Sequence, residues 1–174
     1  MTSLREQRFN YVFPSGWRVE KWDDTEFHKD RFSNSLGSAK SVDFIAISPD
    51  PRDEIWLIEC KDFRLASAES VKKNCDAIPQ KFKDSLAALV CARNDCDGNI
   101  QSFSRSALKK TQLRCIVHWE FAFPHDRRLF APKTMVANIK IKLKQQLRVA
   151  DPSSLIGNQQ HISAILPLTI QEIL

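Results

Sequence analysis

The chain has 174 residues, of which 43% are hydrophobic and 27% are charged. This length fits a single domain, residues 1–174, that folds without disulfide bonds or a structural metal. The longest apolar runs fall short of the roughly 18 residues that suggest a membrane span, so we expect neither a transmembrane segment nor a membrane partner. The N-terminus contains Arg5 and Arg8 with no apolar core behind them, which differs from a secretory signal and predicts a cytoplasmic protein.

The net charge is +5, from 26 basic and 21 acidic residues, and the pI is near 9.0. This balance is compatible with a polyanionic partner such as nucleic acid. Basic residues crowd the second half of the chain, where Lys140 and Lys144 are candidates for contacts with a nucleic-acid backbone. The five cysteines are odd in number and contain no CxxC pair, so reduced thiols are expected.

The first predicted elements are an irregular segment and a short strand within residues 12–22. Asp23 and Asp24 offer an N-cap for a short helix over residues 25–32. Two apolar strands, residues 42–47 and 55–61, flank a segment rich in Pro and Asp, so we predict a β-hairpin.

The rest of the chain is expected to contain, in order, helices over residues 67–74, 81–93 and 100–111, a strand over 113–123 and a last strand over 161–166. Residues 133–149 allow two interpretations, because apolar residues alternate with lysines as in a strand but also recur every four residues as in a helix. The length of the segment favours a helix. These elements predict a three-layer α/β domain, with a mixed β-sheet flanked by helices on both sides.

The predicted hairpin contains the residues that are candidates for catalysis. Side chains in a strand alternate between faces, so Glu59 and Lys61 point the same way. If the hairpin closes symmetrically about Pro51, Asp43 lies opposite Glu59 with about 5 Å between their Cβ atoms. A slip of one residue would move Asp43 to the other face.

Two facing carboxylates repel one another, and a hydrated Mg²⁺ or Mn²⁺ ion is their natural neutraliser. We expect Asp43, Glu59 and the carbonyl oxygen of Cys60 to be its ligands. Lys61 would hold the attacking water or stabilise charge on a phosphoryl oxygen. The alternative is an ordinary ion pair in a strand, although charged groups in such apolar strands are costly without a ligand or a task.

The order of an Asp, a turn and an apolar strand that ends in Glu59-Cys60-Lys61 resembles the signature of the PD-(D/E)XK nuclease superfamily. The resemblance covers residues 25–93 and implies a restriction-endonuclease-like core in which Asp43 and Glu59 bind Mg²⁺ or Mn²⁺ and Lys61 serves the attacking water. The chain departs from the signature at Val42, where the superfamily has Pro.

Members of the superfamily also often carry an acid on the preceding helix, which implies Glu26, with Asp30 as a second choice. A polar residue on the following helix is frequent as well, which makes Gln80 and Lys81 candidates to face the site. The expected function is metal-dependent hydrolysis of DNA, or less readily RNA, and a homodimer could cut both strands of a duplex. The alternative is a catalytically silent nuclease fold that acts as a binding or inhibitory module in a defence or mobile-element context.

Overall fold

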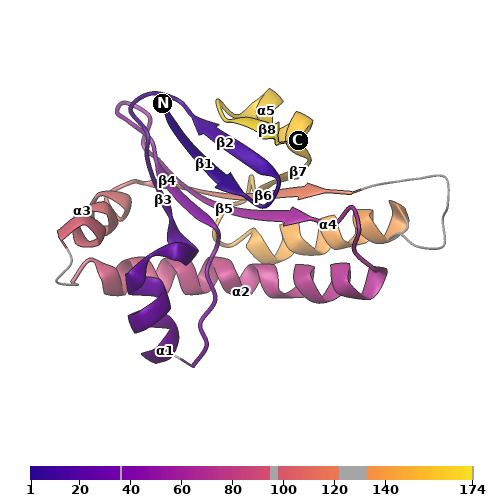
Figure 1. The fold of residues 1–174 in the computed structure, drawn as a ribbon, viewed down its shortest axis with the longest axis horizontal. Helices are drawn as coiled ribbons and strands as arrows, with labels where there is room; N and C mark the ends of the chain where they lie inside the picture. The colour runs from indigo at the N-terminus through magenta and orange to yellow at the C-terminus, as the bar shows by residue number, and fades with distance from the viewer. Residues whose placement is uncertain (36, 95–97, 122–132, 174) are drawn as a thin grey trace.

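The computed structural model describes residues 1–35, 37–94, 98–121 and 133–173, which form a mixed α/β structure with two β-sheets (Figure 1). The strands are β1 (Thr2–Glu6), β2 (Phe9–Phe13), β3 (Arg18–Lys21), β4 (Phe44–Ile47), β5 (Glu54–Asp62), β6 (Gln112–Glu120), β7 (Leu155–Gly157) and β8 (Thr169–Glu172). The helices are α1 (Ser33–Ser35), α2 (Ala68–Ala92), α3 (Gly98–Ala107), α4 (Lys133–Leu147) and α5 (Gln159–Ile165). A 3-10 turn, η1 (Trp22–Asp24), and a π-helical turn, η2 (Phe27–Phe32), join β3 to α1.

The larger sheet has the strand order β3-β4-β5-β6-β7. Its first three strands are antiparallel neighbours, whereas β5, β6 and β7 run parallel. The carboxyl ends of these three parallel strands therefore lie at one edge of the sheet, the place where open α/β sheets usually bind ligands.

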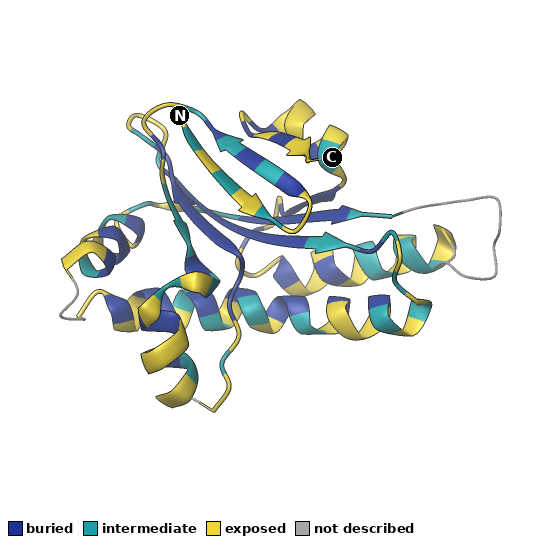
Figure 2. Ribbon diagram, viewed as in Figure 1, coloured by how far each residue is buried: buried dark blue, intermediate teal, exposed yellow. Residues whose placement is uncertain are grey.

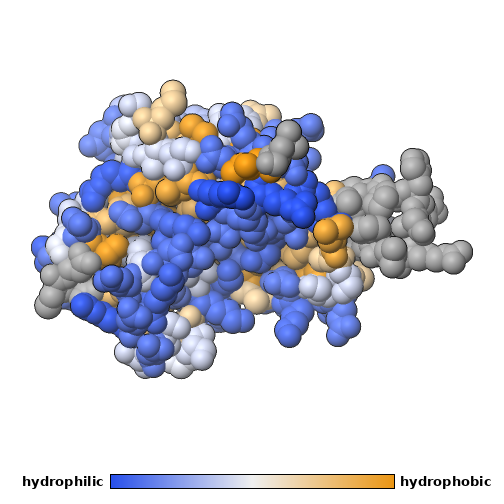
Figure 3. All heavy atoms as spheres, viewed as in Figure 1, coloured by the Kyte–Doolittle hydropathy of each residue, from blue (hydrophilic) through white to orange (hydrophobic). Residues whose placement is uncertain are grey.

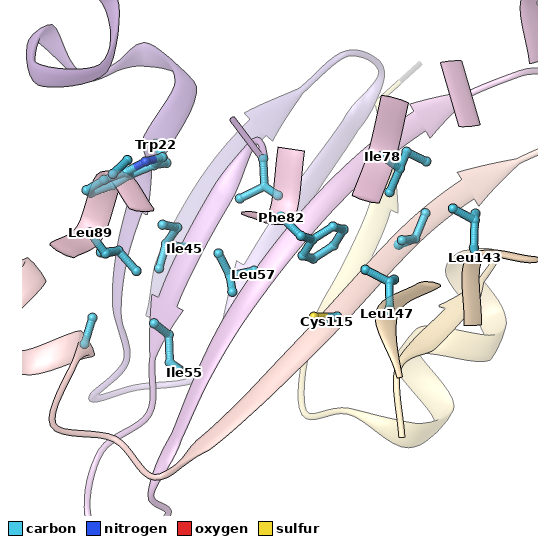
Figure 4. Close-up of a cluster of buried hydrophobic side chains, with 14 of the residues drawn as sticks. Trp22, Ile45, Ile55, Leu57, Ile78, Phe82, Leu89, Cys115, Leu143 and Leu147 are labelled. Atoms are coloured by element: carbon cyan, nitrogen blue, oxygen red, sulfur yellow. The ribbon is translucent and has the colours of Figure 1, made fainter. Parts of the chain in front are cut away.

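One face of this sheet packs against α2 and α4 (Figures 1 and 4). Ile45 of β4 and Leu57 of β5 lie in this core together with Phe82 of α2 and Leu147 of α4. The central strands are buried along nearly their whole length (Figure 2). A polar side chain that points to this face from β5 therefore lies between the sheet and the helices.

The opposite face is covered by α5 and by the second sheet, which has the order β1-β2-β8 (Figure 1). Tyr11 of β2 and Ile162 of α5 pack there against Phe44 and Ile58. The sequence predicted helices on both faces and missed this sheet. The β1–β2 hairpin turns at Gln7, a non-glycine residue with a φ of 53°, so no Asn-Gly or Gly-rich signature marks it.

Helix α2 corrects the prediction of two helices separated near Pro79. It is one helix of 25 residues that contains Pro79, and Ser67 caps it by accepting a hydrogen bond from the Ser70 N–H. Proline removes one backbone hydrogen bond from a helix interior. The burial of Ile78 and Phe82 beside Pro79 offsets this loss, because these side chains fill the core over the sheet.

In the carboxyl-terminal third of the chain, one of the two interpretations of residues 133–149 is confirmed and the strand predicted over residues 161–166 is wrong. Residues 133–147 form helix α4, as their length favoured, and its apolar stripe ends in buried Leu143 and Leu147. Residues 161–166, predicted as a strand, lie mostly in helix α5 instead. Asn158 caps this helix by accepting a hydrogen bond from the His161 N–H, and Asn at this position is a common start signal for a helix.

The remaining predicted elements are present with shifted ends. The hairpin β4–β5, helix α3 and strand β6 are confirmed, while residues 122 and 123 of the expected strand lie outside the described part of the chain. No helix within the described residues is both long and apolar enough to cross a membrane. The face seen in Figure 3 is largely hydrophilic, with small separated hydrophobic patches.

Candidate functional site

The hairpin register is the one that the sequence predicted. Ile45 pairs with Leu57, and the last rung of the ladder joins Phe44 to Ile58, so the residues just beyond it are Asp43 and Glu59. The carboxylate of Asp43 reaches across to β5, where its Oδ2 accepts a hydrogen bond of 2.6 Å from the Cys60 N–H. Asp43 therefore continues the hairpin with its side chain after the backbone ladder ends.

Four charged side chains meet at this end of the hairpin, and we call them the charge cluster: Asp43, Glu59, Lys61 and Lys81. The Lys61 and Lys81 Nζ atoms each lie 2.7 Å from Glu59 Oε1. Lys81 Nζ also lies 3.9 Å from Asp43 Oδ1. Lys81 comes from α2, so the helix that packs on the sheet completes a cluster that the hairpin begins.

Glu59 is the most buried member of the cluster, with no exposed surface. Neither of its carboxylate oxygens completes a hydrogen bond of normal geometry with a described residue, and Oε2 has no ion-pair partner among them either. A buried carboxylate oxygen without a donor costs about 1–3 kcal/mol. Such an atom is suited to accept a ligand, either a water proton or a cation.

Burial and the charge of Glu59 make ionisation of the second carboxyl group in the cluster, that of Asp43, unfavourable. Burial and the neighbouring Glu59 carboxylate raise the pKa of Asp43 to about 7, although Lys81, Lys61 and the Cys60 N–H act in the opposite direction. Burial lowers the pKa of Lys61, but Glu59 and Asp43 outweigh it, and the net shift of the Lys61 pKa is upward. Lys61 is therefore held as an ammonium, while Asp43 takes up a proton near neutral pH.

A third acid acts on this site, and it is not the one preferred from the sequence. Burial, followed by the charges of Asp43 and Glu6, raises the pKa of Asp23 to about 6. The Asp23 Oδ1 atom is buried and accepts no hydrogen bond from a described residue. The sequence placed Asp23 on one predicted helical face with Glu26 and Asp30, but in the structure Asp23 lies in the turn η1, where the charge of Asp43 acts on it.

Glu26 lies elsewhere. It is exposed and lines a separate hollow beside Arg18 and Ile100. Asp30 is exposed on η2 as well. The expected helix over residues 25–32 is instead the π-helical turn η2, with Glu26 just before its first residue, and both side chains lie at the surface.

Of the other predicted site residues, Cys60 and Lys81 lie at the charge cluster and Gln80 lies at the surface. The Cys60 carbonyl oxygen lies 3.4 Å from the Gln7 amide nitrogen, which donates to it. Gln80 donates a hydrogen bond of 2.6 Å to Asp84 in a hollow beside Lys40, so of the two candidates on α2 only Lys81 joins the cluster.

Lys140 and Lys144 lie one helical turn apart on α4 and do not contact the charge cluster. Lys144 is exposed, whereas Lys140 is partly buried and lines a pocket at the end of β6. Burial and the charge of Lys144 lower the pKa of Lys140.

The opposite face of the sheet holds a buried polar network that the sequence did not predict. The Tyr11 hydroxyl and His118 Nδ1 lie 2.5 Å apart, and His118 Nε2 lies 3.1 Å from Glu120 Oε1. The same Glu120 oxygen accepts a hydrogen bond from the Gln159 N–H. Tyr11 is 107 positions from His118 in the chain, so no local spacing could indicate this pair.

The comparisons with known proteins leave the family open. No family model and no solved structure matches the chain. The chain is 28% identical over 183 residues to part of a cysteine–tRNA ligase of Neisseria meningitidis serogroup A. This similarity covers 87% of the chain but 25% of the ligase, so the chain spans about a quarter of the length of this curated relative.

Proposed function

We propose that the chain hydrolyses phosphodiester bonds of nucleic acid, DNA before RNA, with a divalent metal ion bound at the charge cluster of a restriction-endonuclease-like core. The observation that carries this proposal is the meeting of Asp43, Glu59 and Lys61 at one end of the hairpin. Their order and spacing resemble the PD-(D/E)XK signature, and the burial of Asp43 and Glu59 separates them from ordinary surface ion pairs.

The residues fit a hydrated Mg²⁺ or Mn²⁺ ion. Mg²⁺ commonly binds through one or two carboxylates and keeps several waters. Asp43 and the unpartnered Oε2 of Glu59 would supply these carboxylates, and the Cys60 carbonyl lies on the same side of β5 as Asp43. The described residues hold no group of three or more His, Cys, Asp or Glu side chains arranged around one point, so the proposed ion would depend on two carboxylates, one backbone carbonyl and water.

When bound, the metal supplies a Lewis acid that lowers the pKa of a water molecule and offsets charge on the phosphoryl group. The protein residues position the reactants around it. Lys61 keeps its proton and its side chain is still 16% exposed, so its ammonium can orient the attacking water or stabilise a phosphoryl oxygen. Lys81 balances the two carboxylates before metal and substrate arrive.

A second candidate function is a silent binding or inhibitory module with the same fold. The two ammonium groups already offset the two carboxylates of the charge cluster, and this observation favours a structural role for the cluster. The similarity to part of a cysteine–tRNA ligase also puts RNA among the substrates to be tested. A homodimer is part of the proposal for duplex cleavage, and sedimentation at assay concentration tests it.

The deciding experiment uses Lys61→Ala. Loss of a group that stabilises charge developing in the transition state costs about 10²-fold or more in turnover. We expect this loss in Mg²⁺ or Mn²⁺ on single- and double-stranded DNA and RNA, with metal and nucleic-acid binding retained. Lys61→Arg should not restore activity, because a planar guanidinium does not replace a compact ammonium.

The matched control is Lys73→Ala, which removes an exposed lysine from α2. It should leave turnover unchanged. Absence of cleavage of every substrate by the wild-type protein, or full activity of Lys61→Ala, would favour the binding module.

A further inference from the structure

A pocket of about 420 Å³ lies at the carboxyl ends of β6 and β7, between α4 and the start of α5. Trp119, Phe121, Val136 and Ala137 give it apolar walls. The Trp119 and Phe121 rings pack edge to face with their centroids 5.3 Å apart. Trp119 is buried, with 4% of its surface exposed, so the surface open to a nucleobase comes mainly from Phe121, Val136 and Ala137. Aromatic and aliphatic surface of this kind is what nucleobases stack on.

The polar lining of this pocket comes from Glu120, Lys133, Lys140, Asn158 and His161. Lys140 is partly buried in its wall and makes no ion pair or hydrogen bond within the described part of the chain. An unpaired ammonium beside an apolar surface is costly unless an anion binds there. Glu120 also lines the pocket, but its Oε1 is occupied by the Gln159 N–H and by His118.

The second oxygen of Glu120 receives no hydrogen bond from a described residue. A carboxylate oxygen in this position accepts the exocyclic amino group of a base such as cytosine. Apolar walls, an acceptor oxygen on Glu120 and the ammonium of Lys140 together match a nucleotide, whose base is flat and whose phosphate is anionic.

The pocket is next to the charge cluster. Trp119 is the register partner of Lys61 on the neighbouring parallel strand, and adjacent strands are about 4.8 Å apart. Paired residues share a face, so Trp119 and Lys61 both point toward α2 and α4. A nucleic-acid strand whose phosphate lies at Lys61 therefore has a neighbouring nucleotide within reach of the pocket.

We propose that this pocket holds one unpaired nucleotide of the substrate, with its base against Phe121 and Val136 and its phosphate at Lys140. The proposal rests on the proposed function and adds a substrate class, nucleic acid with a single-stranded segment. A paired base cannot enter without leaving its stack, which costs a few kcal/mol in a duplex and far less in a single strand.

Binding, measured without cleavage, tests the proposal. Fluorescence anisotropy in EDTA would compare the full chain bound to a labelled single strand of about 12 nucleotides with the same sequence as a blunt duplex. Ala137→Phe fills the pocket and leaves every charge in place. We expect it to weaken single-strand binding by about 10-fold and to change duplex binding by less than about 2-fold.

Asn138→Phe is the matched control, because it adds the same ring at the next position of α4, which is exposed like Ala137 but does not line the pocket. It should bind both probes as the wild type does. Lys140→Gln should also weaken single-strand binding, which provides a second variant if Ala137→Phe does not fold.

Equal binding by the wild type and Ala137→Phe, or an equal loss for both probes, would overturn the proposal. So would displacement of the single strand by a poly-glutamate peptide at the same concentration as by unlabelled DNA, because that result would assign the pocket to acidic peptides. A single-strand preference that depends on the pocket, in a protein that cleaves nothing, would uphold this pocket and refute the nuclease activity. Cleavage at the same rate by the wild type and Ala137→Phe would uphold the nuclease activity and refute the role of this pocket.

Discussion

Replacing Asp43 by Asn should make the protein more stable at mildly alkaline pH. The carboxyl of Asp43 is 7% exposed, and its pKa is raised from 3.8 to about 7 by burial and by Glu59. A group whose pKa is higher in the folded than in the unfolded protein stabilises the fold fully below the unfolded pKa. This contribution disappears as the pH rises through the folded pKa.

The magnitude follows from the two pKa values. A rise from 3.8 to about 7 corresponds to about 4 kcal/mol at about 1.36 kcal/mol per pH unit. About 3 kcal/mol of this disappears between about pH 5 and about pH 8, because the unfolded carboxyl is already ionised there while the folded one still titrates. Asn is neutral throughout and keeps an oxygen that can accept the hydrogen bond from the Cys60 N–H.

Urea unfolding of the metal-free protein at several pH values measures this effect. The free energy of unfolding of the wild type should fall relative to that of Asp43→Asn by about 3 kcal/mol from about pH 5 to about pH 8. Asp24→Asn is the control of opposite sign, because hydrogen bonds from Lys21 and Lys29 lower the Asp24 pKa to about 2. Parallel pH profiles for the wild type and Asp43→Asn would show that Asp43 is already ionised in the folded protein, and the reasoning would fail.

Three further predictions concern the metal, the basic helix and the buried network. Calorimetry with Mn²⁺ should show that the affinity of the protein for the ion rises from about pH 6 to about pH 8, as Asp43 loses its proton. The affinity should also fall by about 10-fold or more in Asp43→Ala. An affinity that changes neither with pH nor in this variant would argue against Asp43 as a metal ligand. Replacing Lys140 and Lys144 by Gln should flatten the salt dependence of nucleic-acid binding by about one unit for each phosphate that the protein no longer neutralises, and an unchanged slope would place both lysines outside the interface. Tyr11→Phe should lower the free energy of unfolding, measured by urea titration, by about 1–3 kcal/mol, because His118 Nδ1 would stay buried without its hydrogen-bond partner. An unchanged free energy of unfolding would mean that a water molecule replaces the Tyr11 hydroxyl.

Much of the candidate site could be predicted because it depends on local geometry. Side chains alternate along a strand, and the turn between residues 48 and 54 sets which positions face each other. Strand alternation and hairpin symmetry therefore placed Asp43 beside Glu59 and Lys61, and the observed rungs have that register. The length of residues 133–149 likewise favoured a helix for the segment that became α4, whereas its apolar spacing allowed a strand as well.

The remainder depends on contacts between distant parts of the chain. The resemblance named both Gln80 and Lys81 as candidates, and the packing of α2 on the sheet decided that Lys81 alone joins the charge cluster. Asp23 rather than Glu26 acts on Asp43 because η1 departs from regular α-helical geometry. Local sequence therefore determined the strands and the acids that they carry, whereas tertiary packing decided which lysine, which further acid and which pocket lie beside them. The periodicity of apolar residues describes one segment at a time. The positions of Lys81, Asp23 and the pocket depend instead on how several segments pack, where the gain from burying apolar groups offsets the cost of desolvating polar ones.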